Sequence, residues 1–103
     1  MAHLRIESYR DDETAVLRLV GDLDAATGAD LERVVRTLFE DGTRSLAFDC
    51  GAVGFMDSTG LRVIISAEQV AHRLGGSVSV RRPADNVRRI MEITGIADLI
   101  SDG

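Results

Sequence analysis

The fold class is decided by the stretch Ser45-Leu-Ala-Phe-Asp-Cys50 and by the segment after it, Gly51-Ala-Val-Gly-Phe-Met-Asp57. A short apolar run bounded by turn residues predicts a buried strand, which we expect at the centre of a sheet. The glycine-rich segment is predicted to be a loop. A helix is then predicted over residues 58–74, because apolar residues recur there at helical spacing. Its inward positions are Leu61, Ile64, Ala67, Ala71 and Leu74.

Upstream of this stretch the pattern predicts two strands and a helix. Residues 4–9 and 14–20 are predicted strands, and the polar turn between them predicts a hairpin. The run Gly21-Asp22-Leu23-Asp24 breaks the second strand, and a helix is expected over residues 25–41 with Asp24 or Thr27 as its cap. The apolar stripe of this helix consists of Leu31, Val34, Val35, Leu38 and Phe39.

Downstream, residues 77–81 alternate like a strand, and a last helix follows Pro83 and ends at Gly95. Its predicted inward stripe is Val87, Ile90, Met91 and Thr94, and the apolar tail Ile96, Leu99 and Ile100 is expected to pack back on the domain. The order ββαβαβα contains two strand–helix–strand passages, which imply parallel strands. We therefore expect one α/β domain: a small mixed β-sheet with an N-terminal hairpin edge and helices packed on it.

Composition excludes several classes of function. All twelve basic residues are arginine, so the chain lacks the lysine of a P-loop and of a Schiff-base enzyme. A net charge of −5 argues against binding to nucleic acid or to an anionic membrane. One cysteine and two histidines form no metal-ligand pattern, so we expect neither a metal nor another cofactor. Without a long apolar run or a secretory segment, the default expectation is a cytoplasmic monomer.

The most informative residues follow two strands that precede helices. Because the carboxyl ends of parallel strands meet at one edge of a sheet, the run 21–24 and the segment ending at Asp57 and Ser58 are expected side by side there. Asp57 or Ser58 is a preferred helix cap, which is the purely structural interpretation. The functional interpretation uses the same position: a phosphate on Ser58 would meet free backbone amides and the positive end of the helix dipole.

Three segments in the right order resemble the STAS domains, specifically the bacterial anti-sigma-factor antagonists. Asp57-Ser-Thr-Gly-Leu61 resembles their D-S-[ST]-G-L signature, Gly21-Asp-Leu-Asp24 with Thr27 resembles G-[ED]-L-D-x-x-T, and Val87–Ile96 resembles the closing helix. The resemblance covers nearly the whole chain and implies a binding protein rather than an enzyme, with no catalytic residues of its own.

The resemblance also implies a switch. Ser58 would be phosphorylated by an anti-sigma factor with serine-kinase activity, the unphosphorylated protein would bind that partner, and a PPM-type serine phosphatase would reset it. The residues expected to bind the partner are Asp22, Asp24, Thr27, Asp57, Ser58, Thr59, Gly60 and Arg62. Thr59 is a second hydroxyl that the pattern does not exclude as acceptor, but the family places the acceptor directly after the aspartate.

Arg62 departs from the family, which usually has a small residue there. It is expected one turn beyond Ser58, either contacting the partner, or folding back on the phosphate, or simply solvated. Two other functions stay open from sequence. One is a STAS subunit of an ABC-type transport assembly, in which Ser58 is not phosphorylated. The other is a nucleotide-binding domain, which the missing lysine disfavours.

Overall fold

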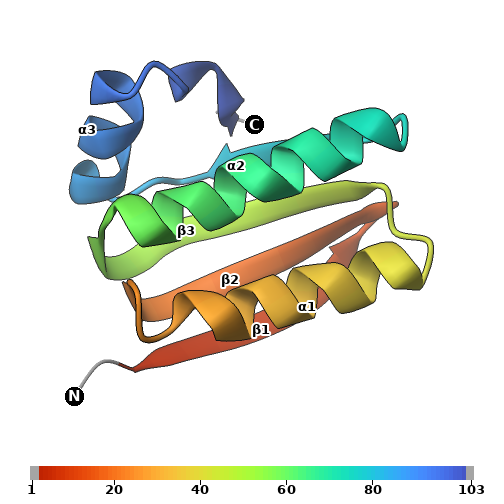
Figure 1. The fold of residues 1–103 in the computed structure, drawn as a ribbon, viewed down its shortest axis with the longest axis horizontal. Helices are drawn as coiled ribbons and strands as arrows, with labels where there is room; N and C mark the ends of the chain where they lie inside the picture. Colours follow the sequence, from red (N-terminus) through yellow and green to blue (C-terminus); the bar gives the residue numbers. More distant parts are fainter. Residues whose placement is uncertain (1–2, 102–103) are drawn as a thin grey trace.

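The computed structural model describes residues 3–101 and contains a five-stranded sheet in the order β1-β2-β3-β4-β5 (Figure 1). The elements are β1 (Leu4–Asp11), β2 (Thr14–Leu23), α1 (Gly28–Glu40), β3 (Ser45–Met56), α2 (Ser58–Arg73), β4 (Ser77–Arg81), α3 (Asp85–Ile93), a 3-10 turn (Ala97–Leu99) and β5 (Ile100–Ser101). β1 runs antiparallel to β2, and the other neighbours are parallel. The predicted mixed α/β sheet with a hairpin edge is confirmed, and β5 extends it.

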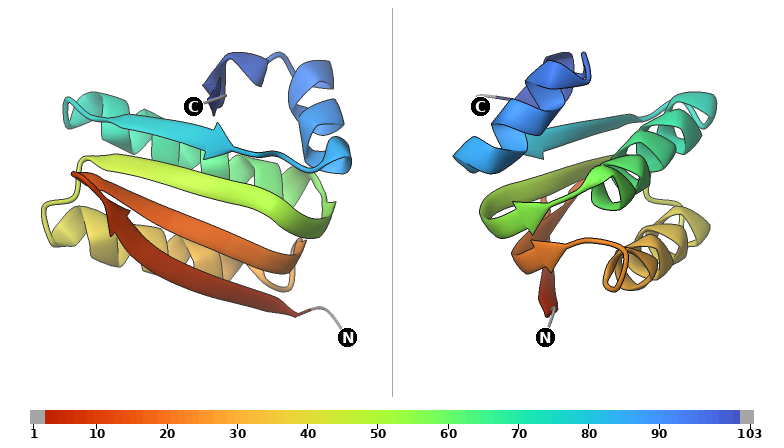
Figure 2. Two further views of the ribbon diagram at one scale, coloured as in Figure 1. Left: turned by 180° about the vertical axis from the view of Figure 1, so that it is seen from behind. Right: turned by 60° about the vertical axis from the view of Figure 1, so that its left-hand side comes forward.

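The core lies between the sheet and the helices α1 and α2, which cover the same face (Figure 2). Leu17 of β2 and Phe48 of β3 are fully buried there against Leu31 of α1 and Ile64 of α2. β3 is central as predicted, and its apolar run is buried. Burying side chains of this size stabilises a fold by about 1.5–3 kcal/mol each, so this layer defines the domain.

The predicted loop over residues 51–57 is wrong, because β3 continues to Met56. Two register shifts against β2, after Asp49 and after Val53, each insert one extra residue into β3. The spacing of the buried side chains of β3 reflects both insertions. It is two residues from Leu46 to Phe48 and Cys50, and then three residues to Val53 and three again to Met56. Gly51 and Gly54 lie at these bulges, where a missing side chain lets the strand bend. Glycines that resemble a loop in the sequence therefore belong to a bulged strand.

The predicted boundary between the second strand and the first helix also moves. β2 extends to Leu23 rather than ending at residue 20, since it stays paired with the extended β3. α1 begins at Gly28 rather than at residue 25, because a turn held by the Asp24 carboxylate occupies the positions in between. The strand end and the helix start are thus joined by a compact turn.

Two positions predicted to face inward are exposed. Leu74 lies just past the end of α2 and is 43% exposed, and Thr94 lies just past the end of α3, where its hydroxyl donates to the Ile90 carbonyl. In both cases the helix stops before the periodic pattern does. The prediction for the C-terminal tail is confirmed, since Ile96, Leu99 and Ile100 pack against the core.

The sheet face turned away from α1 and α2 carries a row of charges. Glu7, Arg18, Asp49 and Arg81 are in register on β1, β2, β3 and β4, with alternating sign. Opposite charges on neighbouring strands attract each other weakly, and the closest of these pairs is Glu7 with Arg18 at 3.0 Å. This row of the outer face is therefore charged, although Val16 and Ala47, one pair further along the strands, are apolar and buried.

Candidate functional site

The start of α2 is held tightly against the end of β2. The backbone amide of Asp57 donates to the Leu23 carbonyl at 3.3 Å. Gly60 lies directly over the same residue: a side-chain carbon there would be 2.5 Å from the Leu23 carbonyl oxygen, closer than atoms can pack. Only glycine lets the helix approach the strand so closely, and the first turn of α2 is fixed as a result.

Asp57 is the helix cap. Its Oδ1 atom accepts the backbone amides of Thr59 at 2.9 Å and Gly60 at 3.0 Å. Ser58 is the first residue of α2, is exposed, and its hydroxyl makes no hydrogen bond within residues 3–101. The structural and functional interpretations of this motif therefore fall on different residues: Asp57 stabilises the helix, and the Ser58 hydroxyl stays available.

This arrangement limits which backbone amides a phosphate on Ser58 could meet. The amides of Thr59 and Gly60 already bind the Asp57 carboxylate. A phosphate would therefore lie beside a carboxylate that already accepts two of the amides at this end of the helix. The positive end of the helix dipole still favours an anion at this position.

The turn between β2 and α1 is built by Asp24 and Thr27. The Asp24 carboxylate accepts the amides of Ala26 at 2.9 Å and Thr27 at 3.2 Å. The Thr27 hydroxyl donates to the Asp22 carbonyl at 2.8 Å and accepts the Asp24 amide at 3.0 Å. Thr27 is only 5% exposed, so it positions this turn and a partner would not reach it.

The two predicted segments do lie side by side. Leu23 pairs with Met56, and Thr59 packs near Gly28, where an added side-chain carbon would be 3.6 Å from the Thr59 methyl group. Among the residues expected to bind a partner, Ser58 and Arg62 are exposed, and Asp22, Asp24, Asp57 and Thr59 are half-buried. Gly60, like Thr27, is buried and serves the packing of the site.

Phe55 was missed by the sequence analysis. It is 50% exposed, pairs with Asp22 across the β2–β3 ladder and lies three residues before Ser58. On its other side, the Asn86 side chain of α3 donates to the Gly54 carbonyl at 2.9 Å and ties α3 to the end of β3. The sequence did contain a signal for this residue, because an aromatic side chain stands between the glycine-rich segment and the capping aspartate. Half-exposed aromatic side chains are typical anchors of protein interfaces.

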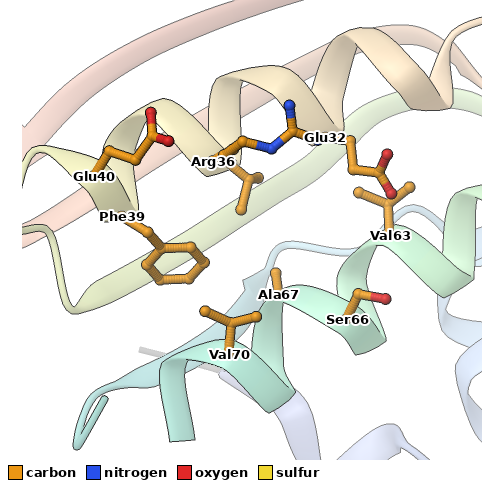
Figure 3. A pocket seen from close by; sticks show the side chains of 9 residues that line it. Glu32, Arg36, Phe39, Glu40, Val63, Ser66, Ala67 and Val70 are labelled. Carbon is orange, nitrogen blue, oxygen red and sulfur yellow. The ribbon is translucent and has the colours of Figure 1, made fainter. Parts of the chain in front are cut away.

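A groove of about 410 Å³ separates α1 from α2 on the outer side of the helical layer (Figure 3). Its walls are mainly apolar, with Val35 and Phe39 on α1 facing Val63, Ala67 and Val70 on α2. The carboxylates of Glu32 and Glu40 lie at its rim. Arg36 also lines the groove, and because one guanidinium stands against two carboxylates, the charged lining is net negative, which disfavours binding of a polyphosphate there.

Within residues 3–101 no group of three or more His, Cys, Asp or Glu side chains is arranged to hold a metal ion. In the same residues, no helix combines the length and apolar character needed to cross a membrane. Cys50 is fully buried, and burial together with the neighbouring Asp49 charge raises the pKa of its thiol to about 12. It therefore belongs to the core and not to the site.

Comparison with known proteins agrees with this geometry. Residues 6–101 match the family model described as Mlab, STAS domain. The chain is 31% identical to an anti-sigma-B factor antagonist of Staphylococcus aureus over 98 residues, which are 95% of this chain and 91% of that protein.

Two solved structures share the fold. The anti-sigma factor antagonist SpoIIAA in its unphosphorylated form has a TM-score of 0.84 at 20% identity, covering 98% of this chain and 88% of that one. An anti-sigma factor antagonist from Mycobacterium paratuberculosis has a TM-score of 0.85 at 21% identity, with 95% and 83% covered. With its matching motifs, its fold and these relatives, the chain belongs to the STAS domain family.

Proposed function

We propose that this protein is an anti-sigma-factor antagonist that binds an anti-sigma factor through the surface around Ser58. In this proposal the partner is also a serine kinase. It transfers the γ-phosphoryl group of ATP to the Ser58 oxygen, which loses its proton while ADP leaves. Phosphorylation ends the complex, and a PPM-type serine phosphatase restores the unmodified serine. The protein works as a binding module in the cytoplasm, as a monomer and without a cofactor.

The observation that carries the proposal is the division of roles at the start of α2. Asp57 alone caps the helix, so the Ser58 hydroxyl is exposed and has no structural role in the described residues. Thr59, the other hydroxyl, is half-buried with its methyl group near Gly28. The named relatives, which are anti-sigma-B factor antagonists at up to 31% identity, support the choice of partner.

Electrostatics explains how the modification would act. A phosphoserine carries about −1.5 to −2 charges at pH 7. It would stand beside Asp57, near the turn that holds Asp22 and Asp24, on a chain with a net charge of −5. A partner surface that fits the unmodified site would then face repulsion and an added desolvation cost. A loss of about 3 kcal/mol lowers affinity roughly a hundredfold, and no refolding is needed.

The test is phosphotransfer from an anti-sigma kinase of the same organism with labelled ATP. The parent protein should be labelled, Ser58→Ala should not be, and the matched control Thr59→Val should be labelled like the parent. Undiminished labelling of Ser58→Ala would overturn the assignment. Binding measured by calorimetry should persist for Ser58→Ala and fall about a hundredfold for the phosphorylated protein. Equal binding of the two forms would contradict the switch.

A further inference from the structure

Arg62 lies one helical turn after Ser58. Both residues belong to α2, both are exposed, and residues four apart on a helix are neighbours on its surface. Arg62 makes no ion pair with any side chain in residues 3–101. Its guanidinium is therefore a cation next to Ser58 that has no ion-pair partner among the described residues.

A phosphate on Ser58 has few other partners along α2. The amides of Thr59 and Gly60 are taken by Asp57, and the other arginine of the helix, Arg73, lies at its far end. An anion placed four residues before a cation is the favoured orientation of such a helix pair. A guanidinium also binds phosphate oxygens with two parallel hydrogen bonds.

We propose that Arg62 is the counter-ion of a phosphate on Ser58, bound along the helix while Asp57 keeps its cap. The phosphate itself rests on the function proposed above, and the role of Arg62 goes beyond it. The pair neutralises part of the added charge. Arg62 thereby reduces the difference in partner affinity between the two forms, and it sets how sharply the modification switches binding.

The experiment installs phosphoserine at position 58 during translation, so it needs no kinase. The second pKa of the phosphate, near 6 in an unperturbed phosphoserine, is followed by phosphorus NMR in the parent, in Arg62→Gln and in the control Arg73→Gln. We expect the phosphate pKa to rise by about 0.3 unit in Arg62→Gln, as for an exposed helix pair, and to stay unchanged in Arg73→Gln. Asp22, Asp24 and Asp57 are present in all three proteins, so their effects cancel.

An unchanged phosphate pKa in Arg62→Gln, or an equal rise in Arg73→Gln, would overturn the inference. This readout uses the protein alone. A failure of the proposed function would be seen as equal binding of the two forms to the anti-sigma partner. It is therefore distinguishable from a failure of the inference about Arg62.

Discussion

Arg82, whose backbone adopts a φ of +48°, turns its guanidinium back onto the carboxylate of Asp49. The Asp49 side chain is 4% exposed, whereas the Arg82 side chain is 71% exposed. The ion pair therefore joins a buried anion on the central strand to a cation at the surface. It links β3 to the turn that leads from β4 into α3, where the Ala84 amide also donates to the Cys50 carbonyl at 3.2 Å.

Replacing Arg82 by alanine should destabilise the protein more than replacing its neighbour. Arg82→Ala leaves a buried carboxylate without its charged donor, and we expect the free energy of unfolding in urea to fall by clearly more than in the control. The control Arg81→Ala breaks a pair with the exposed Asp11 and should cost less than about 0.5 kcal/mol. Equal losses in the two variants would show that burial of Asp49 does not matter.

The same pair should make stability depend on acid. Burial raises the pKa of Asp49, but hydrogen bonds from Arg82 and the Gly51 amide, together with the Arg82 charge, outweigh it and hold the pKa below its ordinary 3.8. A carboxyl with a lowered pKa in the folded state stabilises the fold above the unfolded pKa, and this contribution is lost as pH falls through the folded pKa. In urea titrations, the stability difference between the parent and Asp49→Asn should be constant from pH 5 to 7 and shrink below about pH 4. A difference independent of pH would contradict this account.

The two glycines where α1 and α2 begin should respond oppositely to alanine. In Gly60→Ala the new carbon meets the Leu23 carbonyl oxygen at 2.5 Å, and we expect a loss of roughly 2–3 kcal/mol in unfolding free energy. In Gly28→Ala the new carbon makes ordinary contacts at 3.6 Å, so the restriction of the unfolded chain should raise stability by about 0.5 kcal/mol. Thermal melts of the two variants test this, and a stable Gly60→Ala would disprove the close approach.

Substitutions of Asp57 and Ser58 should differ in their effect on the free energy of unfolding. Asp57→Ala removes both capping hydrogen bonds and should lower the unfolding free energy by about 1 kcal/mol. Ser58→Ala changes an exposed hydroxyl that bonds to nothing in the described residues, and should stay within about 0.5 kcal/mol of the parent. Urea unfolding of both variants gives the answer. A large loss in Ser58→Ala would mean that Ser58 shares the cap.

Cys50 should be inert in the native protein. Its thiol is fully buried with a pKa of about 12, so at pH 8 it is neither accessible nor ionised. A thiol reagent such as DTNB should react only as fast as the protein opens, and immediately in urea. Prompt reaction of the native protein would contradict the burial of β3.

The sequence predicted the order of elements because that order follows from apolar spacing. Phe48 and Leu46 mark a buried strand whatever lies around them, and Leu31 and Val35 mark the inner side of a helix. The ends of the elements were less well predicted. Gly51 and Gly54 occur in loops and in bulges alike, and only pairing with β2, which is far away in sequence, decides between the two.

The candidate site was predicted as a set of residues but not as a set of roles. The motif placed Asp57 and Ser58 together, yet which of them caps the helix depends on a backbone angle that the residue types do not fix. Thr27 and Gly60 were expected to contact a partner, and both are buried because they hold the two segments together. Phe55 was overlooked because its exposure follows from the bulges in β3.

The two single-residue insertions in β3 have a consequence for length. Before the first insertion the even-numbered residues of β3 face the core. After it Val53, an odd-numbered residue, does so, and after the second insertion the even-numbered Met56 faces the core again. Adding one further residue between the two insertions would turn Val53 out into water, or else displace Met56 and the start of α2 that follows it. Residues 50–56 should therefore tolerate exchanges of side chain far better than an added residue.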